Sequence, residues 1–151
     1  MEDRVEDLLS QMTIEEKVGL MFHPMIGMRK NGELQESRIG MSPVPTSEYL
    51  VERKINHFNL YQITTLKHTA EWHNRLQKMA ERTRLGIPAT LSSDPRHSFG
   101  SMIGTTMYTE GFSHWPEPIG LAAARDPELT RRFGDIARRE YRCIGIRTAL
   151  H

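Results

Sequence analysis

The stretch that decides the fold is Ile87-Pro88-Ala89-Thr90-Leu91-Ser92-Ser93-Asp94-Pro95-Arg96-His97. Its short apolar run is typical of a buried strand, and an acid, an arginine and a histidine follow directly. In parallel α/β proteins the reactive groups lie just past the carboxyl ends of the strands. A carboxylate, a guanidinium and an imidazole at such an edge can hold a ligand rich in hydroxyl groups. The stretch therefore predicts a strand that ends in a polar binding site.

The segments on either side alternate between helical and extended patterns. Apolar alternation and turn signals predict strands at 57–63, 87–92 and 146–151. Helical spacing and capping residues predict helices at 5–21, 66–82 and 126–145. The first of these is a helix pair or one bent helix, because Thr13 and Glu16 fit a capping box inside it. Strands that alternate with helices predict an α/β fold with a parallel sheet.

Two long segments, 23–48 and 100–118, carry glycine and proline without any periodicity. We expect both to be loops. Loops of this length are uncommon inside a compact domain and are often functional.

Composition excludes several classes of function. The chain has 151 residues, of which 38% are hydrophobic and 26% charged, which is enough for one domain with a core. A net charge of +1 without a basic run gives no expectation of nucleic-acid binding. No apolar stretch approaches the roughly 20 residues of a membrane helix. The first residues lack the apolar segment of a secretory signal, so a cytoplasmic location is expected, with a secreted or periplasmic parent as the alternative.

The sequence predicts no metal ion and no cofactor. His68 and His73 are five positions apart, whereas two ligands on one helix face need a spacing of four. The glycine-rich segment 100–106 lacks the lysine of a phosphate loop. A single cysteine, Cys143, excludes a disulfide within the chain, and we expect it to be a packed thiol on the inner side of its helix.

Five segments, in the same order, resemble the N-terminal barrel domain of glycoside hydrolase family 3, the family of β-glucosidases and exo-glucanases. They cover nearly the whole chain and lie at 5–19, 83–88, 93–97, 115–123 and 137–146. The third, Ser93-Asp94-Pro95-Arg96-His97, is similar to the segment at the edge of that family's sugar pocket. The fourth begins Trp115-Pro116-Glu117-Pro118, and the fifth contains Glu140 in its helix.

This resemblance implies a retaining β-glycosidase that acts on terminal β-linked glucosides. Asp94 would accept hydrogen bonds from sugar hydroxyls, and Arg96, His97 and Trp115 are the other candidate substrate-binding residues. One departure is Ser98, because the family has glycine after the histidine. That side chain can alter the turn that positions His97.

The resemblance also implies that residues 1–151 are only part of a domain. A TIM barrel needs eight strands and about 200 residues, so three strands form a parallel-strand, partial TIM-like barrel that is incomplete at its C-terminus. In the family the nucleophile and the acid/base carboxylate lie beyond this region. We therefore expect no catalytic residue here and no hydrolysis by the chain alone.

Each candidate site residue also has a structural explanation. Asp94 in Ser-Ser-Asp-Pro is a good turn starter, because its side chain can bond its own backbone. Arg96 and His97 could form an ion pair with Asp94. Trp115 beside a proline could anchor a loop instead of stacking on a sugar ring.

Other carboxylates have weaker claims to chemistry. Glu140 falls beside the apolar stripe of its helix, and we expect a buried pair with Arg147 or a backbone donor. Glu110 and Glu117, in one loop, are the only acids that would serve an unrelated hydrolase.

Two hypotheses of different classes follow. The first is a portion of a β-glycosidase in which Asp94 contacts the substrate. The second is a non-catalytic module that binds carbohydrate or a partner chain, and self-associates through an open sheet edge.

Overall fold

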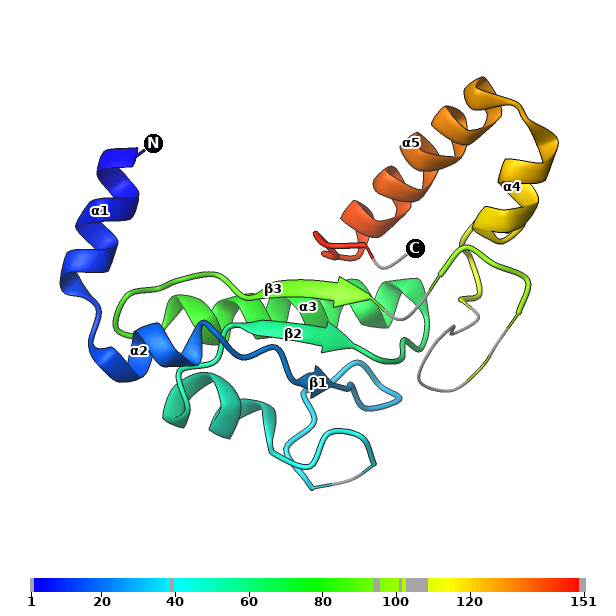
Figure 1. Cartoon of the computed structure of the whole chain (residues 1–151). Helices are drawn as coiled ribbons and strands as arrows, with labels where there is room; N and C mark the ends of the chain where they lie inside the picture. Colours follow the sequence, from blue (N-terminus) through cyan, green and yellow to red (C-terminus); the bar gives the residue numbers. More distant parts are fainter. Residues whose placement is uncertain (1, 39, 94–95, 101, 103–108, 150–151) are drawn as a thin grey trace.

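The computed structural model describes residues 2–38, 40–93, 96–100, 102 and 109–149. Its centre is a parallel sheet in the order β1-β2-β3, with α3 packed behind it (Figure 1). The strands are β1 (Met25–Ile26), β2 (His57–Leu60) and β3 (Thr90–Ser93). The α/β class and the parallel sheet are therefore confirmed, and the barrel stays a prediction.

The observed strands differ in length from the predicted ones, and one strand, β1, was not predicted. The strands expected at 57–63 and 87–92 form as β2 and β3, which each contain four residues. The strand expected at 146–151 contributes a parallel bridge between Thr148 and Ser92, and residues 150–151 lie outside the described residues. The prediction of a loop over 23–48 was wrong at β1. Two residues between Pro24 and Gly27 are too few to show a period-two pattern.

Caps fix the start of the main helices. The helices are α1 (Glu2–Gln11), α2 (Ile14–Gly19), the π-helix η1 (Glu48–Glu52), α3 (Leu66–Glu81), α4 (Pro118–Ala124) and α5 (Pro127–Cys143). The capping box of Thr13 and Glu16 is present, so the first segment is a helix pair. Side chains of Thr65 and Asp126 cap α3 and α5. Neither η1 nor α4 was predicted.

The core lies between α3 and the sheet. Residues three or four positions apart form the buried face of α3: Thr69, Trp72, Leu76 and Ala80. Alternate residues of the strands complete the core, namely Ile26, Phe58, Leu60 and Leu91, all fully buried. His57 and Asn59 of β2, and Thr90 and Ser92 of β3, alternate with the buried positions and are partly exposed.

The expectation of a packed Cys143 thiol was wrong, because Cys143 is exposed. Tyr141 and Ile144 point into the protein. At 100° per residue, Cys143 is rotated by about 200° from Tyr141, which turns it toward solvent.

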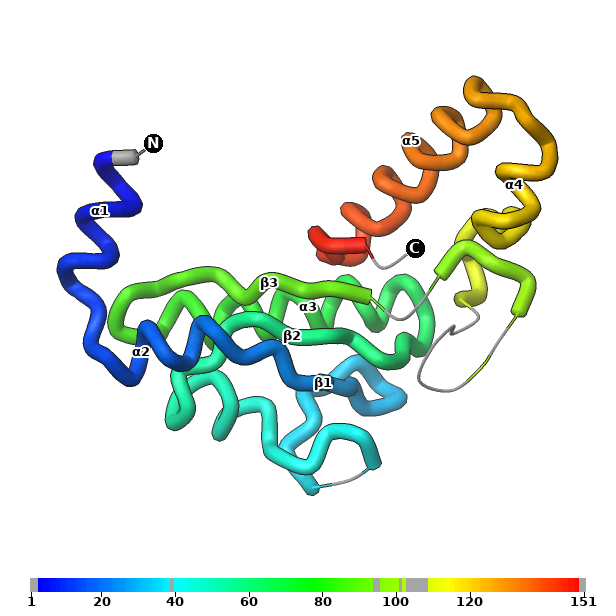
Figure 2. The backbone as a smooth tube through the Cα atoms, viewed as in Figure 1, coloured from blue at the N-terminus to red at the C-terminus, as the bar shows by residue number. Residues whose placement is uncertain are grey.

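The chain beyond β3 builds the region at the carboxyl ends of the strands. There α4 lies past the strand ends, and α5 brings the chain back toward β3 (Figures 1 and 2). α1 lies at the opposite end and stands away from the sheet (Figure 2). His97 is therefore close to the last turn of α5, where it contacts Glu140 and Tyr141.

Candidate functional site

The candidate site is the segment that follows β3. Asp94, the carboxylate predicted to contact a sugar, lies outside the described residues. Arg96 is partly buried and His97 is buried, and both come directly after the carboxyl end of β3. A parallel bridge between Ser98 and Trp115 joins this segment to the loop before α4. The structure therefore places three of the four predicted site residues, Arg96, His97 and Trp115, on neighbouring segments.

His97 is enclosed by aromatic rings. Its imidazole stacks on Phe112, with ring centroids 4.4 Å apart and planes 2° apart. Tyr141 of α5 meets it edge-on at 4.7 Å. The side chain of His97 has no exposed surface. This packing indicates that His97 holds the segment after β3 against α5.

Glu140 joins three parts of the site. Its Oε2 lies 2.8 Å from Nε2 of His97 and accepts hydrogen bonds from the backbone N–H and the hydroxyl of Ser113, both at 3.1 Å. The Ser113 hydroxyl accepts a hydrogen bond from Nε1 of Trp115 at 2.9 Å. A backbone donor to Glu140 was expected. The side-chain partner is His97 rather than Arg147, which is exposed.

Burial sets the protonation of this cluster. Burial lowers the pKa of His97, and the nearby Glu140 carboxylate opposes that shift. Burial raises the pKa of Tyr141 to about 12, opposed by a hydrogen bond with Ser93 and by the positive charge of Arg96. Tyr141 is therefore protonated at neutral pH. The cluster positions a loop, and among the residues that the structure describes no second carboxylate belongs to it.

Sequence reasoning missed a second polar cluster, on the sheet face away from α3. The Ser92 hydroxyl lies 2.9 Å from Nε2 of His23 and donates to Oδ1 of Asn59 at 3.0 Å. The rings of His23 and His57 are 6.2 Å apart, and burial together with His23 lowers the pKa of His57. The period of two in β2 and β3 places Asn59 and Ser92 on this face, and that signal could have revealed the pair.

The two acids considered for an unrelated hydrolase lie at the protein surface. Glu110 and Glu117 are exposed. Among the residues that the structure describes, no group of three histidine, cysteine or acidic side chains is arranged to hold a metal ion. In the same part of the chain, no helix has the length and apolar character that a membrane crossing requires.

Comparison with known proteins places the chain beside β-glucosidases. It is 48% identical over 151 residues to "Beta-glucosidase C" of Emericella nidulans, which covers 99% of this chain and 24% of that protein. It is 42% identical over 153 residues to "Periplasmic beta-glucosidase/beta-xylosidase" of Dickeya chrysanthemi, with 98% of this chain and 22% of that protein covered.

A more distant relative is the "Putative beta-xylosidase" of Formosa agariphila, at 29% identity over 150 residues. No family model matches the chain. The chain spans about a quarter of the length of the two β-glucosidase relatives described above. The resemblance to β-glucosidases that the motifs predict is confirmed by these relatives.

Proposed function

We propose that this chain, a β-glucosidase-like segment by its relatives, forms part of the sugar-binding edge of a retaining β-glycosidase. The observation that carries the proposal is 48% identity to a β-glucosidase over 99% of the chain. The parallel sheet supports it, because ligands of α/β proteins bind beyond the carboxyl ends of such strands. In the proposed whole protein, the three strands belong to a TIM-like barrel, and residues 1–151 are one part of its domain.

Asp94 is the proposed contact to substrate. It follows β3 directly in the sequence, and an aspartate carboxylate accepts hydrogen bonds from adjacent sugar hydroxyls. Arg96 and Trp115 are proposed to line the same subsite, with the indole ring available to an apolar sugar face. His97 acts behind them, because it is buried between Phe112 and α5.

The bond-breaking carboxylates are proposed to lie elsewhere in the whole protein. Retaining hydrolysis needs two carboxyl groups about 5–5.5 Å apart, one as nucleophile and one as acid/base. In the described part of the chain, the acid beside His97 is Glu140, which already contacts His97 and Ser113. A terminal β-linked glucoside is the proposed substrate. A periplasmic or secreted parent is favoured over a cytoplasmic one, because one relative is named periplasmic.

Activity of the isolated chain tests this division of roles. We expect no hydrolysis of an aryl β-glucoside by residues 1–151, and weak glucose binding seen by NMR titration. Asp94→Asn should abolish that binding, and Glu110→Gln, an exposed carboxylate in the next loop, should leave it unchanged. Turnover that is lost on Asp94→Ala would show that the catalytic groups are within this chain.

A second candidate is a non-catalytic module that assembles through a sheet edge. It is favoured by β1, a strand of two residues that pairs with β2 and, in the described part of the chain, with no other strand. Light scattering separates the two candidates. A defined oligomer that glucose does not stabilise favours the module, whereas a glucose-stabilised monomer favours the glycosidase segment.

A further inference from the structure

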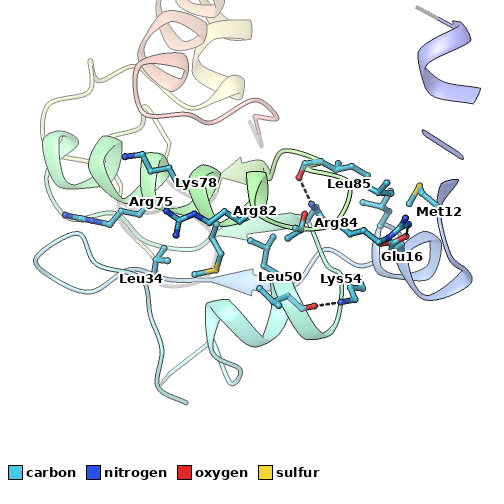
Figure 3. A pocket seen from close by; sticks show the side chains of 16 residues that line it. Met12, Glu16, Leu34, Leu50, Lys54, Arg75, Lys78, Arg82, Arg84 and Leu85 are labelled. Carbon is cyan, nitrogen blue, oxygen red and sulfur yellow. Dashed lines mark hydrogen bonds and ion pairs between the residues drawn. The ribbon is translucent and has the colours of Figure 1, made fainter. Parts of the chain in front are cut away.

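A large apolar pocket lies at the other end of the sheet from the candidate site. Residues of α2, η1 and α3 line it, it is partly open to solvent, and its volume is about 650 Å³. Figure 3 shows the side chains that line it. Asn56, Leu85 and Ile87, which come just before β2 and β3, form its wall at the amino ends of the strands. Its other apolar lining includes Leu20, Leu34, Leu50, Val51 and Met79. Pockets of roughly 300–1,000 Å³ with such lining are typical sites for small molecules.

The pocket exists because the two connections between the strands contain helices of unequal length. The crossover from β2 to β3 contains α3, a helix of 16 residues that is about 24 Å long. The connection from β1 to β2 contains only η1, with five residues. One flank of α3 therefore has no helix of equal length beside it, and a hollow remains between α3 and η1.

Positive charge surrounds this hollow. Lys54, Arg75, Lys78, Arg82 and Arg84 line it, whereas Glu16 is the one acid among the lining residues (Figure 3). Arg84 forms an ion pair with Glu16, which neutralises both. Of the remaining cations, Arg75, Lys78 and Arg82 lie on the α3 side of the pocket, and Lys54 lies on the η1 side.

Two of these cations are available to a ligand. Lys78 and Arg82 are exposed, and their side chains form no hydrogen bond or ion pair with any residue that the structure describes. Arg75, three positions before Lys78, donates to the carbonyl of Gly32. Arg75 and Lys78 of α3 and its C-cap residue Arg82 are three and four positions apart, a spacing at which like charges repel each other. A bound anion would relieve that repulsion.

We propose that this pocket binds a free, small amphiphilic anion, in which an apolar chain enters the hollow and a carboxylate or phosphate head meets Lys78 and Arg82. Charge complementarity selects this occupant over a neutral apolar molecule. Asn56 and Ile87 line the pocket just before β2 and β3, whereas Arg96 and His97 follow the carboxyl end of β3, so the pocket is separate from the described part of the candidate site.

Calorimetric titration of the full chain with octanoate and octan-1-ol tests the proposal. The two probes share an apolar chain and differ in charge. Octanoate should bind once per chain and about threefold or more tightly than the alcohol, as expected for two exposed charge contacts. Lys78→Gln with Arg82→Gln should remove that preference. Arg138→Gln with Arg142→Gln, an equally spaced exposed pair on α5, should leave it intact.

A second variant tests the apolar half of the site. Val51 lines the pocket and is 47% exposed, so Val51→Trp can fill the hollow without unfolding the core. It should weaken octanoate and the alcohol alike. Equal affinity for the two probes, or an unchanged preference in the Lys78/Arg82 variant, would overturn the proposal. Binding only to anionic phosphatidylglycerol vesicles would instead identify a lipid surface, and a dimer that excludes octanoate would identify a second copy.

Discussion

Replacing Glu140 by alanine should loosen the segment after β3 from α5. Glu140 Oε2 contacts Nε2 of the fully buried His97 at 2.8 Å and accepts two hydrogen bonds from Ser113 at 3.1 Å. A hydrogen bond to a charged group contributes roughly 1.5–3 kcal/mol, and removal of one partner leaves the others buried without compensation. The Glu140 side chain is 27% exposed, which reduces the loss. We expect the free energy of unfolding to fall by about 2 kcal/mol.

Urea denaturation followed by circular dichroism measures this change, and thermal unfolding gives a second value. A loss of about 2 kcal/mol corresponds to a fall in Tm of about 4–8 °C for a chain of this size. Asp135→Ala is the matched control, because it removes a carboxylate from the same helix that pairs with Arg138 and Arg139 at the surface. That pair should contribute less than about 1 kcal/mol. Equal losses for Glu140→Ala and Asp135→Ala would contradict the network described here.

Two other predictions concern glycine and histidine. Gly145→Ala should destabilise the chain by more than about 2 kcal/mol, because its φ is +89° and a Cβ would lie 2.1 Å from the ring of His73. Gly134→Ala should instead stabilise the chain by about 0.5–1 kcal/mol, because Gly134 lies inside α5 with open space around it. Urea denaturation of both variants measures these changes. A Gly145→Ala variant as stable as the unmodified chain would contradict the close approach of Gly145 to the His73 ring. The free energy of unfolding should also fall between pH 7.5 and pH 5.5. Burial lowers the pKa values of His57, His73 and His97 in the folded chain. As the pH falls below about 6.5, these histidines therefore take up protons first in the unfolded chain, which stabilises the unfolded state. Urea midpoints that are equal or higher at pH 5.5 would contradict it.

Local signals were sufficient where one element carries its own pattern. The buried stripe of α3 runs from Thr69 to Ala80, and Thr65 caps the start of the helix, so the helix could be predicted almost to its last residue. The capping box of Thr13 and Glu16 is likewise contained in four positions. By contrast, β1 has two residues, and its pairing with Asn59 and Leu60 of β2 is the only mark of a strand.

The candidate site was predictable only in part, because its contacts join distant positions. The motif after β3 identified His97, and the helix pattern indicated that Glu140 needs a partner. His97 and Glu140 contact each other because α5 brings the chain back toward β3 (Figure 1). The two residues are 43 positions apart, and no local sequence pattern encodes such a contact. Phe112 was assigned to a loop, yet it stacks on His97 and is buried.

Substrate binding by Asp94 can be measured most directly in a chimera. Residues 1–151 would replace the aligned quarter of the β-glucosidase from Emericella nidulans, to which they are 48% identical. We expect the chimera to hydrolyse an aryl β-glucoside, Asp94→Asn to lower its kcat/KM by about 10–100-fold, and Glu110→Gln to leave kcat/KM unchanged. A folded but inactive chimera, or an Asp94→Asn chimera with undiminished kcat/KM, would contradict a sugar-binding role for this segment.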